Sequence, residues 1–184
     1  MNRPRLYIDV DGPLNPYDAK PERRPQGYTT FRYYRTAGSP TGPAGPGGTS
    51  RPLRVWLNPA HGEQLLRLAE FYELTWATVW GVEANTWIAP KLGLPELPVV
   101  QWPTMYAAGP EGTFWKTQHL ISHAAGRAFA WIDDELSERD RDFVGYYHDG
   151  KALLHHVDPR VGLRDNDFHA LERWARTTDS AQAT

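Results

Sequence analysis

Short apolar runs, rich in aromatic and β-branched residues, recur along the chain between more polar segments. An apolar run of four to nine residues with turn-forming residues at its ends is typical of a β-strand. We therefore predict strands over residues 6–10, 27–35, 51–57, 72–80, 97–102, 128–132 and 152–157. The polar positions between the runs set the places where helices and loops are expected.

Helical spacing of apolar residues appears in four of the intervening segments. The first follows Asn58-Pro59, a pair typical of a helix start because Asn caps a helix and Pro is tolerated in its first turn. Apolar side chains three or four positions apart then continue to residue 71. Further helices are predicted over 83–92, 116–125 and 167–176.

The alternation of strands with helix-length segments predicts the fold class. It is typical of βαβ units, which build an α/β protein with a mainly parallel sheet and helices on both faces. We expect one such domain over residues 1–176 and a disordered tail over 177–184. Ligands of these sheets bind at the carboxyl ends of the strands, so the chemistry is sought there.

Residues 16–57 are predicted to form an insertion after the first strand. Two strand-like runs within it flank residues 36–50, which consist entirely of Gly, Pro, Ser, Thr and Ala. Because this composition cannot bury a core, we expect a flexible loop there. The two runs predict a β-hairpin that projects from the domain as a small flap.

Composition excludes several classes of site and partner. The 184 residues include no cysteine, which rules out disulfides, thiolate zinc sites and cysteine nucleophiles. No apolar run approaches the roughly 20 residues that span a bilayer, so we expect a cytoplasmic protein without a membrane partner. Residues 1–54 hold nine Lys and Arg against four Asp and Glu, an excess that falls short of a nucleic-acid-binding signature.

Polar side chains lie at the ends of three of the predicted strands. The first strand leads into Asp9 and Asp11, the strand over 72–80 carries Thr78, and the strand over 128–132 leads into Asp133 and Asp134. Residues i and i+2 of an extended chain point to one side, so Asp9 and Asp11 are expected to face one site. An isolated pair of this kind often marks only a turn, but a second acidic strand end indicates an oxygen-rich site suited to Mg²⁺.

In this pattern the chain resembles the haloacid dehalogenase (HAD) superfamily of phosphotransferases. The four motifs of that superfamily appear in order over most of the chain as "DVDGPLN", Thr78 in "TWATVW", Lys116 in "FWKTQH" and "WIDDE". The residues around the first, second and fourth motifs, together with "VDPRVGL", are also similar to those of small bacterial HAD domains grouped with RNA-repair proteins. The resemblance implies a HAD-like Rossmannoid fold with a flap or cap between the first two motifs.

The resemblance also implies a role for each motif residue. Asp9 would attack phosphorus and form an aspartyl-phosphate, and Asp11 would act as the general acid and base. Thr78 and Lys116 would bind the phosphoryl group. Mg²⁺ would be held by Asp9, the Asp11 carbonyl and Asp133, with Asp134 in direct or outer support. Thr75 competes with Thr78 for the second motif, and Pro13 stands where the superfamily commonly has Thr or a small aliphatic residue.

Substrate contacts are expected from the flap and from the loop before Lys116. Arg32 and Arg54, with Arg35 and Arg51, are expected to meet an anionic substrate. Trp102 and Trp115 are expected to line the site. The predicted function is hydrolysis of a phosphomonoester, either a small metabolite or nucleotide or a nucleic-acid end. Two alternatives stay open: a catalytically silent phosphate- or nucleic-acid-binding module on the same fold, and an unrelated α/β domain with acidic turns. The oligomeric state is left open.

Overall fold

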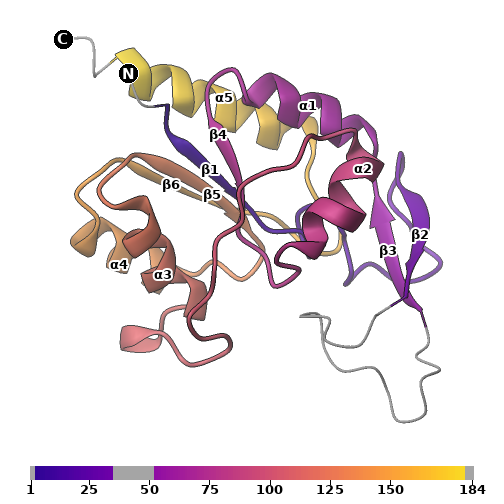
Figure 1. Ribbon diagram of the computed structural model, residues 1–184, viewed down its shortest axis with the longest axis horizontal. Coiled ribbons are helices and arrows are strands. Elements are labelled where there is room, and N and C mark those ends of the chain that lie inside the picture. The colour runs from indigo at the N-terminus through magenta and orange to yellow at the C-terminus, as the bar shows by residue number, and fades with distance from the viewer. Residues whose placement is uncertain (1–2, 35–51, 181–184) are drawn as a thin grey trace.

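The computed structural model describes residues 3–34 and 52–180, so the predicted loop over 36–50, Arg35 and Arg51 lie outside the described residues. A four-stranded sheet forms the centre of the molecule (Figure 1). All of its neighbouring strands run parallel, in the order β4-β1-β5-β6. The prediction of an α/β protein with a parallel sheet is confirmed. The strands are β1 (Arg5–Ile8), β4 (Glu73–Trp76), β5 (Phe129–Asp133) and β6 (Ala152–His156).

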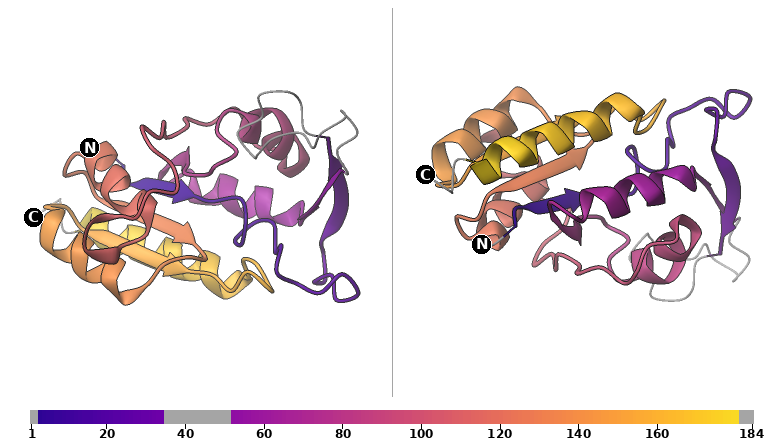
Figure 2. Two further views of the ribbon diagram at one scale, coloured as in Figure 1. Left: turned by 90° about the horizontal axis from the view of Figure 1, so that it is seen from below. Right: turned by 90° about the horizontal axis from the view of Figure 1, so that it is seen from above.

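Helices cover both faces of the sheet, as predicted (Figure 2). Because successive strand residues point to opposite faces, Leu6 and Ile8 join the core on one face and Tyr7 joins the core on the other. The first core includes side chains of α1 (Ala60–Leu68) and α5 (Asp165–Ser180), and the second includes those of α3 (Trp115–Ala124) and α4 (Glu138–Tyr147). The central strands are therefore buried on both sides, which explains their continuous apolar runs.

The predicted hairpin is present as a separate two-stranded antiparallel sheet of β2 (Thr29–Tyr33) and β3 (Leu53–Leu57). It lies beyond one end of the parallel sheet and beside α2 (Ala89–Leu92) (Figure 1). Tyr33 anchors it there, since its ring centroid lies 4.8 Å from those of Trp80 and Trp87. Phe31 packs against the same core, so two aromatic residues of β2 hold the hairpin in place.

The prediction of a strand over 97–102 is wrong. In the described part of the chain this segment makes one isolated bridge, between Trp76 and Val99, on the open side of β4. The Pro98 carbonyl and the Val100 N–H each bond to the main chain of Trp76. Prolines at positions 95, 98 and 103 remove the N–H groups that a longer ladder would use. The strand predicted over 72–80 also ends early, at Trp76.

Three helix predictions need correction. Residues 83–92 form a π-helical turn (Ala84–Ile88) followed by α2, because Pro90 lacks an N–H and crowds the preceding turn. Helix α5 continues to Ser180, so residues 177–180 are helical rather than part of a tail. Helix α4 was not predicted at all. Its sequence signal is a capping box in which Ser137 and Asp140 bond reciprocally.

Candidate active site

The carboxyl ends of β1 and β5 hold two aspartates against one buried lysine. Asp9 directly follows β1, and Asp133 is the last residue of β5. Lys116, in the first turn of α3, donates from Nζ to Asp9 Oδ2 at 2.7 Å and to Asp133 Oδ2 at 2.8 Å. Its side chain is only 2 % exposed, and that of Asp133 is fully buried. One ammonium group therefore fixes the positions of both carboxylates.

Burial and mutual charge set the protonation of this cluster. Burial raises the pKa of Asp9, the Lys116 ammonium opposes this, and the Asp133 carboxylate raises the pKa further. Burial acts to lower the pKa of Lys116, but the two carboxylates outweigh it and hold that pKa above its usual value. The lysine therefore stays charged, and its single positive charge faces two acidic side chains.

A third carboxylate, that of Asp134, joins the cluster. Oxygen atoms of Asp9, Asp133 and Asp134 all lie within 4.8 Å of one another. Tyr17 donates its hydroxyl proton to Asp134 Oδ2 at 2.9 Å. Burial first, and then the Asp133 carboxylate, raise the pKa of Asp134 to about 6. With one lysine among three carboxylates, the cluster carries excess negative charge that a cation would neutralise, and it could hold a metal ion.

The Asp133 carboxylate is oriented from its own loop. Its Oδ1 accepts the main-chain N–H of Glu135 at 3.0 Å, and its Oδ2 accepts the Trp131 indole N–H at 3.2 Å. Both donors lie two residues from Asp133, so residues at the end of β5 fix the orientation of this carboxylate. Fixed carboxylates of this kind reduce the reorganisation that metal or phosphate binding requires.

Lys116 is positioned by a residue that sequence reasoning missed, the fully buried Asp140 of α4. Its Oδ1 accepts the Phe114 N–H at 2.7 Å and the Thr117 hydroxyl at 2.6 Å, on either side of Lys116. Burial acts to raise the pKa of Asp140, but hydrogen bonds from Ser137, Thr117 and Phe114 hold it below its usual value. The ionised Asp140 thus joins the start of α4 to the start of α3.

Asp11 belongs to a different set of contacts from Asp9. Its Oδ1 accepts Asn15 Nδ2 at 2.7 Å, and its Oδ2 accepts Trp80 Nε1 at 2.9 Å. The side chain of Asp11 is not part of the three-carboxylate cluster. Both residues lie beyond the end of β1 at Ile8, and both line the same pocket, as expected.

The turn after Asp11 accounts for two residues of the first motif, Gly12 and Pro13. Gly12 has a left-handed φ of 86°, and a Cβ there would lie 2.3 Å from Asp134 Oδ1. The hydrogen bonds that close this turn run from the Leu14 and Asn15 N–H groups to the Val10 carbonyl. Neither needs an N–H from position 13, so Pro13 is compatible with the turn. The Pro13 carbonyl accepts the N–H of Leu163, which ends the "VDPRVGL" segment. Two segments far apart in sequence are thereby joined beside the site.

Thr78 lies two residues beyond β4 and is fully buried. Its hydroxyl accepts the Trp80 N–H at 3.4 Å, and its carbonyl accepts the Trp102 indole N–H at 3.0 Å. Its neighbour Val79 lines the pocket, whereas Thr78 does not. Thr75, the competing threonine, lies within β4, where its hydroxyl has no hydrogen-bond partner among the described residues.

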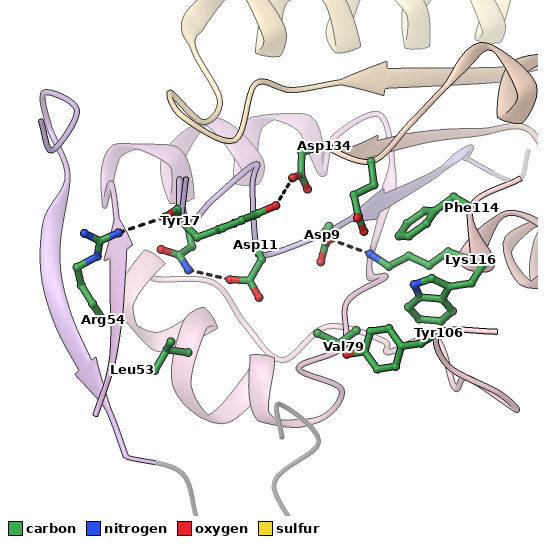
Figure 3. Close-up of a pocket in the computed structure, with 13 residues that line it drawn as sticks. Asp9, Asp11, Tyr17, Leu53, Arg54, Val79, Tyr106, Phe114, Lys116 and Asp134 are labelled. Carbon is green, nitrogen blue, oxygen red and sulfur yellow. Dashed lines mark hydrogen bonds and ion pairs between the residues drawn. The ribbon is translucent and has the colours of Figure 1, made fainter. Parts of the chain in front are cut away.

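An open pocket of about 370 Å³ lies over Asp9, Asp11, Lys116 and Asp134 (Figure 3). Arg54 lines it from the hairpin, with its guanidinium 3.8 Å from the centre of the Trp56 ring. Arg32 is the direct cross-strand partner of Arg54 but is exposed and lines a separate cavity beside α2. The structure therefore brings Arg54 to the pocket and leaves Arg32 outside. The remaining lining residues are Asn15, Tyr17, Leu53, Val79, Tyr106, Phe114, Trp115 and Glu135.

Several of these wall residues carried no sequence signal. Tyr17 reaches the site from the linker before the hairpin, and Tyr106 from the loop before α3. Of the two tryptophans predicted to line the site, Trp115 does so. Trp102 does not, and packs edge-on against Trp115 with ring centroids 5.0 Å apart. Because these contacts depend on how loops fold over the sheet, spacing along the chain could not reveal them.

Comparisons with protein-family models, with curated proteins and with solved structures give no match to this chain. Among the helices of the described residues, none has the length and apolar character that a bilayer crossing requires.

Proposed function

We propose that this chain is a Mg²⁺-dependent phosphohydrolase of the HAD type that cleaves phosphomonoesters through an aspartyl-phosphate. The observation that carries the proposal is the buried bridge from Lys116 to Asp9 and Asp133, with Asp134 beside it. An ammonium group at the floor of an acidic pocket is suited to binding a phosphoryl group, which needs positive charge beside its nucleophile. Paired carboxylates at parallel strand ends match the motifs on which the HAD resemblance rests.

In the first step Asp9 is the nucleophile. One of its carboxylate oxygens attacks phosphorus as the bond from phosphorus to the ester oxygen breaks. Lys116 holds the Asp9 carboxylate and offsets the charge of the phosphoryl oxygens. Asp11, on the same pocket wall, donates a proton to the departing oxygen so that it leaves as an alcohol.

In the second step water attacks phosphorus of the aspartyl-phosphate. Asp11, now a carboxylate, accepts a proton from that water, and the bond between phosphorus and Asp9 breaks to release inorganic phosphate. The Asp9 carboxylate and the protonated Asp11 are thereby restored. The reaction consumes one water and needs no redox partner.

The metal suits the donor set of the site. Carboxylate oxygens alone, contributed by Asp9, Asp133 and Asp134, are ligands that a hard cation such as Mg²⁺ prefers. When bound, Mg²⁺ would stabilise negative charge on the phosphoryl oxygens and offset repulsion between the substrate and the acidic pocket. Arg54, on the hairpin wall, adds a second cation for an anionic substrate. The hairpin would then act as the flap that selects substrates.

Hydrolysis of 4-nitrophenyl phosphate tests the proposal. We expect turnover by the wild-type protein with Mg²⁺, and none with a chelator or in Asp9→Asn. Asp142→Asn is the matched control, because Asp142 is an exposed aspartate of α4. Acid quenching followed by borohydride reduction should convert a phosphorylated Asp9 to homoserine, which mass spectrometry detects.

The outcomes separate the proposal from its alternatives. Activity that persists in Asp9→Asn or in the chelator would overturn the mechanism. Saturable phosphate binding without turnover of aryl phosphates, mononucleotides or 5′-phosphorylated oligonucleotides would favour a catalytically silent binding module. Neither binding nor turnover would favour an unrelated α/β domain.

A further inference from the structure

Both carboxylate oxygens of Asp11 are held by neutral N–H donors from different parts of the chain. Asn15 Nδ2 reaches Oδ1 at 2.7 Å, and Trp80 Nε1 reaches Oδ2 at 2.9 Å. Two bonds to two oxygens fix the plane of a carboxyl group as well as its position.

Asn15 also connects Asp11 to the hairpin. Its side-chain oxygen accepts the main-chain N–H of Trp56 in β3 at 2.9 Å, and the residue is 2 % exposed. Trp80 is fully buried and packs on Tyr33 of β2, with ring centroids 4.8 Å apart. Each donor to Asp11 is therefore in direct contact with one strand of the hairpin.

We propose that Asn15 and Trp80 are positioning residues for Asp11, which make the geometry of acid catalysis depend on where the hairpin packs. The inference rests on the proposed function, because it presumes that Asp11 protonates a leaving group. General acid catalysis requires the acid within hydrogen-bond reach of the departing oxygen. A carboxyl group free to rotate away from that oxygen would protonate it less often.

The leaving group of the substrate provides the test. Phenoxide is a poor leaving group and needs a proton, whereas 2,4-dinitrophenoxide leaves without one. The two aryl phosphates are otherwise similar in shape. We compare kcat/KM for both esters because it reports on steps up to the first irreversible one, which is attack by Asp9 in this mechanism. Asp11→Asn defines the effect of losing the acid altogether.

Trp80→Phe removes the indole N–H and keeps an aromatic ring in the core. We expect kcat/KM for phenyl phosphate to fall at least about tenfold, part of the 10²–10⁴-fold that general acid catalysis contributes. The value for 2,4-dinitrophenyl phosphate should stay within about twofold. Trp76→Phe is the matched control, since Trp76 is also fully buried but donates its N–H to Asn85. In Trp76→Phe, kcat/KM for the two esters should change by the same factor.

Asn15→Asp separates the two contacts of Asn15. An aspartate keeps an oxygen for the Trp56 N–H but places an acceptor against the Asp11 carboxylate. If Asn15 positions Asp11, this variant should show the same selective loss on phenyl phosphate as Trp80→Phe. If Asn15 serves only to hold the hairpin, kcat/KM should change by the same factor for both esters. Urea unfolding checks that each variant is folded, and Trp80→Phe decides the question if Asn15→Asp is not.

The possible results distinguish this inference from the proposed function. Selective loss on phenyl phosphate in the positioning variants supports the inference. Equal losses on both esters, or no loss, in an enzyme whose activity requires Asp9 would overturn it and leave the proposed function intact. Wild-type activity that does not depend on Asp9 would overturn both.

Discussion

The Asp140 carboxylate of α4 accepts the hydroxyl of Thr117 in α3 at 2.6 Å, in the fully buried space between the two helices. The same oxygen accepts the Phe114 N–H, so it holds both neighbours of the Trp115–Lys116 pair. Asp140 does not line the pocket. It fixes the first turn of α3 and, through it, the direction in which Lys116 enters the site.

Replacement of Asp140 by alanine is expected to lower both stability and activity. The Phe114 N–H and the Thr117 hydroxyl would lose their acceptor, and unfolding by urea should show a loss of about 2–4 kcal/mol. Glu138→Ala is the control, because Glu138 is an exposed acid in the same helical turn. It should cost less than about 1 kcal/mol. An Asp140→Ala protein as stable as Glu138→Ala would contradict this assignment.

Lys116→Met should destabilise the fold as well as abolish phosphatase activity. Methionine matches the length of the buried stem but leaves Asp9 and Asp133 without their shared ammonium. Breaking a buried ion pair in this way costs about 3–5 kcal/mol, measurable by urea unfolding at neutral pH in the presence of a chelator. Lys91→Met, on the exposed surface of α2, serves as the control and should change stability by less than about 0.5 kcal/mol. Equal stability of the two variants would show that the carboxylates do not need the lysine.

Gly12→Ala is expected to remove the response to Mg²⁺. Its Cβ would lie 2.3 Å from Asp134 Oδ1 and 2.7 Å from Asp134 Cβ, so the whole Asp134 side chain would have to shift. Gly93→Ala carries the same left-handed strain, at φ 68°, with no atom within 4 Å of the added Cβ. Both variants should lose about 1–2 kcal/mol of stability from backbone strain. Only Gly12→Ala should also lose the rise in melting temperature that Mg²⁺ is expected to give the wild type.

The buried His61 predicts a loss of stability in mild acid. Its ring lies 5.4 Å from those of Tyr28 and Phe168, and burial lowers its pKa to about 4, against smaller opposing effects of Asp165 and Asp167. The unfolded chain takes up the proton near pH 6.5, before the folded protein does. The contribution of His61 to the free energy of unfolding is therefore fully present above pH 6.5. It declines by about 2–3 kcal/mol as the pH falls toward 4.

His61→Leu tests this dependence in urea unfolding at pH 7 and at pH 4.5. The variant should lose less stability between the two pH values than the wild type does. Desolvation also lowers the pKa of His123 and that of His148, so some acid sensitivity should persist. An unchanged difference between pH 7 and pH 4.5 in His61→Leu would exclude His61 as its source.

The sequence by itself determined the local features of this protein. Apolar runs bounded by turns predicted the strands of the parallel sheet, because a strand buried on both faces needs apolar residues at successive positions. The acidic residues after two of these runs indicated the edge of the sheet at which a site would form. The helix over 138–147 was not predicted, because its mostly polar sequence shows only a weak apolar pattern. The capping box of Ser137 and Asp140 was its one sequence signal.

Only the tertiary structure decided which polar residues meet. Lys116 bridges Asp9 and Asp133 across 107 and 17 residues of chain, and no local pattern encodes that distance. Arg54 reaches the pocket and its cross-strand partner Arg32 does not, although the two look equivalent in sequence. The physical reason is that hydrogen bonding along the backbone sets local structure, whereas the packing of loops and helices over the sheet sets the position of each side chain in the site.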